Sequence, residues 1–96
     1  MDTEIIKDLI DIIRERKNNP NNSSYTCRLL YGGENKIIKK LGEEFAEFLK
    51  AYLTESSDRL VSEIGDLIYH IMVALEYKNI PFENVLDELR KRYKKT

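Results

Sequence analysis

Residues 34–78 read ENKIIKKLGEEFAEFLKAYLTESSDRLVSEIGDLIYHIMVALEYK, and they contain the clearest helical pattern of the chain. Apolar side chains recur at helical spacing over residues 34–53 and again over residues 58–78. The polar residues 54–57 separate the two runs, and Ser56 or Ser57 is suited to cap the second helix. Because the turn is so short, we expect the two helices to fold back as an antiparallel hairpin.

The segments on either side of this hairpin are also predicted to be helical. Helices are expected over residues 3–17, 25–31, 34–53, 58–78 and 81–93. Thr3 is suited to cap the first of them and Ser23 or Ser24 the short second one, which Gly32-Gly33 ends. No run alternates apolar and polar residues over the length of a strand. The sequence therefore predicts an all-α fold with four main helices and one short helix.

The composition limits the classes of protein to which the chain can belong. Its 96 residues fit one domain, 1–96, whose core would be marginal in a monomer, so a homo-oligomer is expected. A net charge of −1 gives no broad attraction for nucleic acid or membrane. Cys27, the single cysteine, allows neither an intramolecular disulfide nor a cysteine-based zinc site. With no signal peptide and no run of ~20 apolar residues, a cytoplasmic protein is expected.

Acidic residues occur at helical spacing on both arms of the predicted hairpin. Glu43, Glu44 and Glu47 lie on the first arm, and Glu63 and Asp66 lie on the second. Positions three and four apart share a helix face, so each arm presents its carboxylates as a group. The two groups lie at similar distances from the turn and hence at similar heights. Carboxylates brought together in this way call for a cation, and oxygen ligands favour Mg²⁺ or Mn²⁺.

The same acids are compatible with two alternative roles. They can be solvated side chains that pair with Lys39, Lys40 or Lys50 at helical spacing. They can also belong to a di-iron carboxylate bundle, but that design uses Glu-x-x-His motifs. The chain has none, because its one histidine, His70, follows Asp66 by four residues and Glu63 by seven.

Two features of these helices bear on packing. Gly42 lies inside a helical run, where it costs about 1 kcal/mol relative to alanine, which suggests close approach by a backbone or a ligand. The aromatic residues at helical spacing, Phe45, Phe48, Tyr69 and Tyr77, are expected in the core.

The pattern Glu44-x-x-Glu47, fifteen residues and then Glu63-x-x-Asp66 resembles the all-α nucleotide pyrophosphohydrolases. Within that superfamily the chain is most similar to the phosphoribosyl-ATP pyrophosphohydrolases. The similar segments are Ser24-Tyr25-Thr26 with Leu29-Leu30, Glu34 to Ile37, Lys39 to Glu44, Asp66 to His70, and Val85 to Arg90. They cover residues 5–93. Cys27-Arg28 and Gly65 depart from the family pattern, and neither departure removes an expected ligand.

This resemblance implies Mg²⁺-dependent hydrolysis of phosphoribosyl-ATP to phosphoribosyl-AMP and pyrophosphate, the second step of histidine biosynthesis. The expected site residues are metal ligands Glu44, Glu47, Glu63 and Asp66, a general base at Glu43 or Glu44, and substrate contacts at Tyr25, Thr26, Lys36 and Lys40. His70 is expected to be a core or interface residue. A homodimer or homotetramer would complete a four-helix bundle around the nucleotide, and the length suggests the form without a fused cyclohydrolase.

Two alternative functions remain open on the sequence. A house-cleaning pyrophosphohydrolase acting on dUTP or non-standard nucleoside triphosphates would carry the same acids. The Tyr25-Thr26 segment and the lysines before Glu43 favour phosphoribosyl-ATP instead. A non-catalytic helical interaction module would need none of the acids for its activity.

Overall fold

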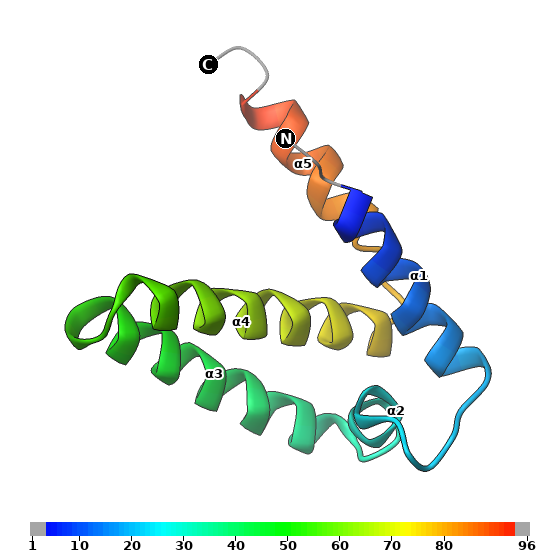
Figure 1. The fold of residues 1–96 in the computed structure, drawn as a ribbon. Helices are drawn as coiled ribbons and strands as arrows, with labels where there is room; N and C mark the ends of the chain where they lie inside the picture. Colours follow the sequence, from blue (N-terminus) through cyan, green and yellow to red (C-terminus); the bar gives the residue numbers. More distant parts are fainter. Residues whose placement is uncertain (1–3, 94–96) are drawn as a thin grey trace.

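The structure is a computed structural model that describes residues 4–93, and within them it is built from helices alone (Figure 1). The helices are α1 (Glu4–Asn18), α2 (Tyr25–Leu30), α3 (Glu34–Thr54), α4 (Ser57–Tyr77) and α5 (Glu83–Tyr93). The predicted all-α fold, with four main helices and one short helix, is therefore confirmed. Thr3, the expected cap of the first helix, lies outside the described residues.

Helices α3 and α4 form the predicted antiparallel hairpin, in which they lie close together near the turn and diverge toward α2 (Figure 1). The turn between them ends at Ser56, whose hydroxyl accepts a hydrogen bond from the backbone N–H of Arg59 and so caps α4. Ser24 caps α2 in the same way, through the N–H of Cys27. Of the alternative caps that the sequence offered, the structure selects Ser24 and Ser56.

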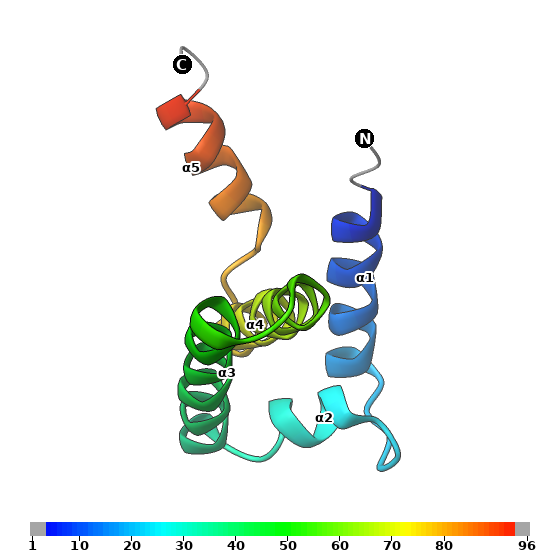
Figure 2. The ribbon, with the colours of Figure 1, turned by 60° about the vertical axis from the view of Figure 1, so that its left-hand side comes forward.

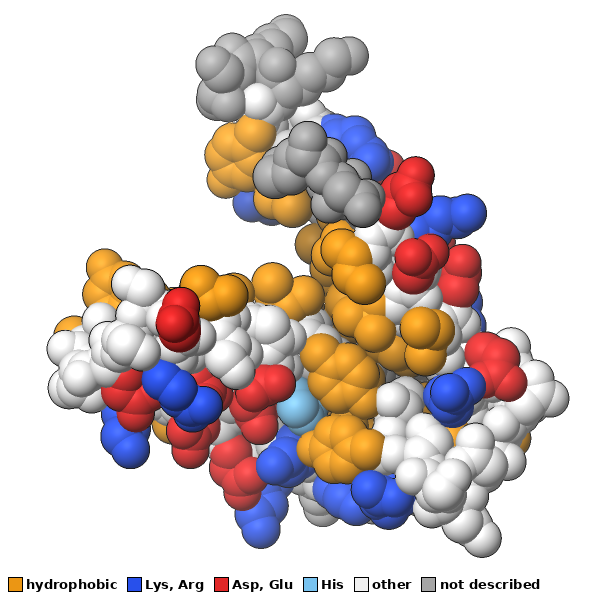
Figure 3. Space-filling model, viewed as in Figure 1, with side chains coloured by type: hydrophobic (Ala, Val, Ile, Leu, Met, Phe, Trp, Pro, Cys, Tyr) orange, Lys and Arg blue, Asp and Glu red, His pale blue; other side chains and the backbone are white. Residues whose placement is uncertain are grey.

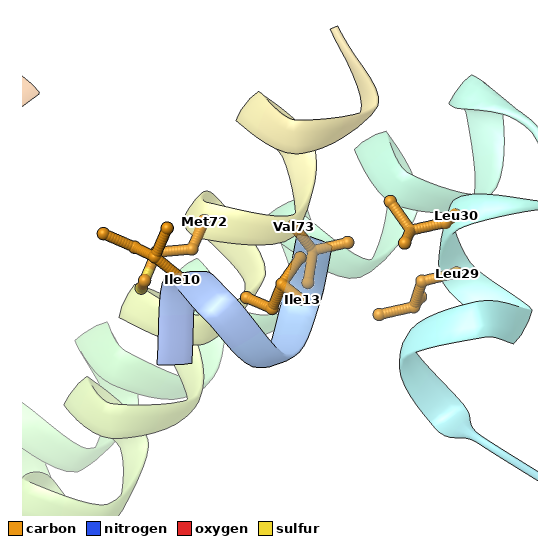
Figure 4. Close-up of a cluster of buried hydrophobic side chains, with 6 residues drawn as sticks. All are labelled: Ile10, Ile13, Leu29, Leu30, Met72 and Val73. Carbon is orange, nitrogen blue, oxygen red and sulfur yellow. The ribbon is translucent and has the colours of Figure 1, made fainter. Parts of the chain in front are cut away.

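The apolar core lies at one end of this hairpin, where α1 and α2 pack against the C-terminal half of α4 (Figure 4). Its buried side chains are Ile10, Ile13, Leu29, Leu30, Met72 and Val73. In Figure 4 these side chains point toward one another from the three helices. The core therefore fixes α2 against α4, the helix that carries Glu63 and Asp66.

Helix α5 begins two residues later than predicted, at Glu83, after a turn in which Asn79 has a positive φ of 61°. It projects to the same side of the molecule as α1 (Figure 2). The Arg14 guanidinium holds both carboxylate oxygens of Glu83, at 2.7 and 3.1 Å, and joins the start of α5 to α1. Phe82 packs against the core just before the helix begins.

Much apolar surface on the hairpin stays uncovered. The chain exposes 7128 Å², whereas a compact monomer of 11.3 kDa would expose about 5,700 Å². Phe45, expected in the core, is 51% exposed, so that prediction is wrong for Phe45. Gly42 lies on an exposed part of α3, and apart from its chain neighbours and the nearby backbone of α3 itself, no described atom lies within 4 Å of where its Cβ would be. The close approach suggested there by the sequence is not made by this chain.

Candidate metal and nucleotide site

Three of the predicted metal ligands come together across the hairpin. Glu44 on α3 and Glu63 and Asp66 on α4 each offer a carboxylate oxygen, and these oxygens lie within 4.8 Å of one another. We call this group the acidic cluster. Figure 3 shows acidic side chains gathered on this part of the surface, next to the histidine and with basic side chains among them. The prediction from spacing, that acids on the two arms lie at matching heights, is confirmed.

Glu63 is the buried member of the acidic cluster, with 5% of its surface exposed. Arg59 lies one turn earlier on α4, and its Nη2 donates to Glu63 Oε1 at 2.6 Å. The same guanidinium reaches Glu55 at 3.7 Å. A buried carboxylate is costly without a counter-charge, and Arg59 supplies one.

Glu43 and Glu47 lie outside the cluster. Glu43 is exposed and pairs with Lys40 at 3.3 Å, while Glu44 lies 3.9 Å from the same ammonium group. The hydrogen bond to Glu43 raises the pKa of Lys40 above its ordinary value, with a further contribution from Tyr25. Glu47 is exposed and has no hydrogen bond or ion pair with the residues that the structure describes. Pairing with lysine, the solvated role considered for the acids, thus accounts for Glu43 but for neither Glu63 nor Asp66.

The acidic cluster fits a small divalent cation of the Mg²⁺ type. An octahedral ion with bonds of about 2.1 Å needs ligand oxygens about 3.0 to 4.2 Å apart. The three oxygens here lie within 4.8 Å of one another, so small side-chain rotations would bring them to that spacing. The donors are all carboxylates, which suits Mg²⁺ or Mn²⁺ better than zinc or copper.

A hydrogen-bonded aromatic group joins the cluster to α2. His70, which is 7% exposed, has Nδ1 at 2.7 Å from the backbone oxygen of Asp66, so this nitrogen carries the proton. Its Nε2 is then the acceptor for the Tyr25 hydroxyl at 3.1 Å. Tyr25 also stacks on Tyr69, with the ring centroids 6.3 Å apart. The phenol of Tyr25 is therefore held in place beside the helix turn that carries Asp66.

The other predicted substrate contacts take two positions. Thr26 is buried, and its hydroxyl shares a hydrogen bond with the Tyr69 hydroxyl. Burial raises the pKa of Tyr69, and the hydrogen bond with Thr26 partly offsets this. Lys36 and Lys40 lie four residues apart on the same face of α3, Lys40 beside the cluster and Lys36 one turn further from it.

Comparison with known proteins identifies the family. The profile of the family described as phosphoribosyl-ATP pyrophosphohydrolase matches residues 6–93. The chain belongs to this family. A phosphoribosyl-ATP pyrophosphatase of Clostridium acetobutylicum is 46% identical over 92 residues, which cover 96% of this chain and 84% of that protein. One from Bacillus mycoides is 44% identical over 89 residues, which cover 93% and 83%.

The phosphoribosyl-ATP pyrophosphohydrolase family also includes longer relatives. The histidine biosynthesis bifunctional protein HisIE of Pyrococcus furiosus is 44% identical over 90 residues, which cover 94% of this chain but 42% of that protein.

Over residues 4–93, none of the helices has the length and apolar content that a membrane span requires.

Two contacts of the site are not predicted from the sequence. Arg59 carries no signal of its own, although it precedes Glu63 by four residues, the spacing at which side chains on a helix meet. His70 is buried, as a core residue would be. Its bond to Tyr25, 45 residues away in sequence, cannot be seen from spacing on one helix.

Proposed function

We propose that residues 1–96 form one domain that hydrolyses the α–β phosphoanhydride of phosphoribosyl-ATP, giving phosphoribosyl-AMP and pyrophosphate, with Mg²⁺ as cofactor. Relatives that carry this substrate in their names match nearly the whole chain. The observation that carries the proposal is the meeting of Glu44, Glu63 and Asp66 across the hairpin. Within a family of pyrophosphohydrolases, such a cluster is suited to neutralising phosphate charge through a cation.

The acidic residues would bind the cation and face the water. Glu44, Glu63 and Asp66 would hold Mg²⁺, which when bound neutralises phosphate charge and lowers the pKa of a water molecule. Glu47 follows Glu44 by three residues and is free to turn toward the cluster as a further ligand. We propose Glu44 rather than Glu43 as the acid that faces the water, because Glu44 belongs to the acidic cluster, whereas Glu43 lies outside it and pairs more closely with Lys40.

The basic and aromatic residues would bind the rest of the substrate. Lys40 donates from an ammonium group that already lies beside the cluster, and it would bind a phosphate oxygen there. Tyr25 presents a phenol whose position His70 fixes. Thr26 would act through Tyr69, because its hydroxyl is already bonded to that side chain. Lys36 would meet an anionic group further along α3.

The activity can be tested by measuring pyrophosphate release from phosphoribosyl-ATP and from a panel of free nucleoside triphosphates, with Mg²⁺ and with EDTA. We expect the fastest turnover on phosphoribosyl-ATP, none with EDTA, and none in Asp66→Asn. Asp11→Asn, at an exposed acid on α1, is the matched control. Faster turnover of dUTP or another free triphosphate would overturn the choice of substrate, and an active Asp66→Asn would overturn the site.

We further propose that a second copy of the chain covers the hairpin. Two exposed apolar stripes run along it at helical spacing. On α3 they are Ile38, Phe45, Leu49 and Tyr52, and on α4 Val61, Ile64, Ile68 and Ile71. The radius of gyration, 14.6 Å, exceeds the ~12.5 Å of a compact chain of this length. Two hairpins joined through these stripes would make a four-helix bundle with a site at each hairpin.

Light scattering after size exclusion tests this assembly. We expect at least twice the 11.3 kDa of one chain for the wild type and a lower mass for Ile68→Glu. Ile12→Glu, at an exposed isoleucine on α1, serves as the control. A wild-type mass of one chain would contradict the proposal.

A further inference from the structure

A separate site, which is basic, lies beyond Tyr25, on the side away from the acidic cluster. A pocket of about 430 Å³ is formed where the loop before α2 meets the start of α3. Arg28 and Lys36 line it together with Asn21 and Asn22, and none of the acidic residues within 4–93 does. We call it the Arg28 pocket.

Arg28 differs from every other arginine of the chain. The remaining five, all within the described residues, each form an ion pair with a carboxylate. Arg28 instead lies over the Tyr25 ring, with Cζ at 5.7 Å from the centroid, and donates to the Ser23 backbone oxygen at 3.4 Å. Because no described carboxylate pairs with it, the Arg28 guanidinium is available to bind an external anion.

Lys36 is placed in the same pocket by the glycine turn. A Cβ at Gly32 would lie 2.7 Å from Lys36 Cδ and 2.6 Å from the backbone oxygen of Arg28. The absence of a side chain at position 32 therefore lets the Lys36 stem pass close to the end of α2. Lys36 has no ion pair within residues 4–93, so its ammonium group is also available.

The Arg28 pocket and the acidic cluster are connected by one face of α3. Lys36, Lys40 and Glu44 follow at intervals of four residues, so they share this face. Lys36 precedes Glu44 by eight residues, which corresponds to about 12 Å along the helix. Tyr25 lies between the two sites, bonded to His70 on one side and covered by Arg28 on the other. An extended ligand with an anion at each end fits this arrangement.

We propose that Arg28 and Lys36 bind the phosphate of the phosphoribosyl group, the group that distinguishes phosphoribosyl-ATP from ATP. The inference rests on the proposed function, since the triphosphate must lie at the acidic cluster. In the substrate, two riboses and the adenine separate this phosphate from the triphosphate. The Arg28 pocket would then select the substrate, because ATP has nothing to place against Arg28 and Lys36.

The test compares Arg28→Gln and Lys36→Gln with the wild type on phosphoribosyl-ATP and on ATP. A charge-assisted hydrogen bond contributes about 1.5–3 kcal/mol, so kcat/KM for phosphoribosyl-ATP should fall about 10- to 100-fold, mainly through KM. Turnover of ATP, which we expect to be slower in the wild type, should fall by a much smaller factor. Arg90→Gln and Lys91→Gln, exposed positions on α5, are the matched controls. An unchanged KM for phosphoribosyl-ATP, or an equal loss on ATP, would overturn the inference.

A binding experiment separates this inference from the proposed function. Ribose 5-phosphate, which carries the distinguishing group alone, is titrated into the ¹⁵N-labelled protein without Mg²⁺. We expect amide shifts around Arg28 and Lys36 in the wild type and none there in Arg28→Gln. If the wild type shows those shifts but releases no pyrophosphate from phosphoribosyl-ATP, the proposed function alone fails. If it is active and shows no shifts, the Arg28 pocket fails.

Discussion

The two halves of α4 differ in what surrounds them. The C-terminal half carries Met72 and Val73, which are buried against α1 and α2. The N-terminal half carries Glu63 and Asp66 of the acidic cluster, and two of its apolar residues, Val61 and Ile64, are exposed. One continuous helix therefore joins a packed core to a site where like charges are held together. Substitutions around the C-terminal half should therefore alter stability, and substitutions around the N-terminal half should alter catalysis.

The largest effect is expected from Glu44→Gln in the acidic cluster. The substitution keeps the shape of the side chain but removes the charge that would hold the cation. We expect pyrophosphate release to fall at least about 100-fold, which corresponds to about 2.7 kcal/mol of barrier. In the Glu43→Gln variant, which changes the neighbouring acid that lies outside the cluster and pairs with Lys40, pyrophosphate release should fall less than about tenfold. An equal loss of activity in the two variants would contradict the prediction that Glu44, and not Glu43, binds the cation.

Leu29→Ala should lower stability and leave catalysis nearly unchanged. Leu29 is 1% exposed and packs in the core at the other half of α4. The lost contacts and the cavity should lower the free energy of unfolding by about 2–5 kcal/mol in urea denaturation. At a temperature where the variant is folded, kcat should stay near the wild-type value. Leu89→Ala, at a 48% exposed leucine of α5, is the control and should change stability little.

The same division separates what the sequence could and could not predict. Apolar spacing, caps and glycines predicted all five helices because these signals act over neighbouring residues. The hairpin put Glu44 opposite Glu63 and Asp66 because helix rise alone sets their heights. Which acids meet depends on how the helices rotate about their axes. That rotation is set by packing, and it leaves Glu43 and Glu47 outside the cluster. The bond between Tyr25 and His70 depends in the same way on how the core places α2.

A smaller effect is expected from Arg59→Met, which should change both stability and the response to Mg²⁺. The variant leaves Glu63 buried without its counter-charge, so in EDTA we expect a loss of about 1–3 kcal/mol in the free energy of unfolding. Mg²⁺ should recover much of this loss, and the rise in melting temperature on adding Mg²⁺ should be larger than in the wild type. Arg92→Met, whose partner Glu88 is exposed, is the control. Equal Mg²⁺-dependent shifts in both variants would contradict the counter-ion role of Arg59.

The smallest effect belongs to the ion pair that joins α5 to α1 near the C-terminal end of α4, where Arg14 also pairs with Glu76 at 3.7 Å. The hydrogen bonds from Arg14 lower the pKa of Glu83, so the folded state favours the charged carboxylate. This contribution is present above the unfolded pKa of about 4.3 and is lost as the pH falls through the folded value. Because both side chains are partly exposed, Glu83→Gln should cost at most about 1 kcal/mol at pH 7. The difference from the wild type should shrink toward zero near pH 3, measured by urea unfolding. A cost that stays constant over this range would mean that Glu83 stabilises the fold through packing and not through its charge.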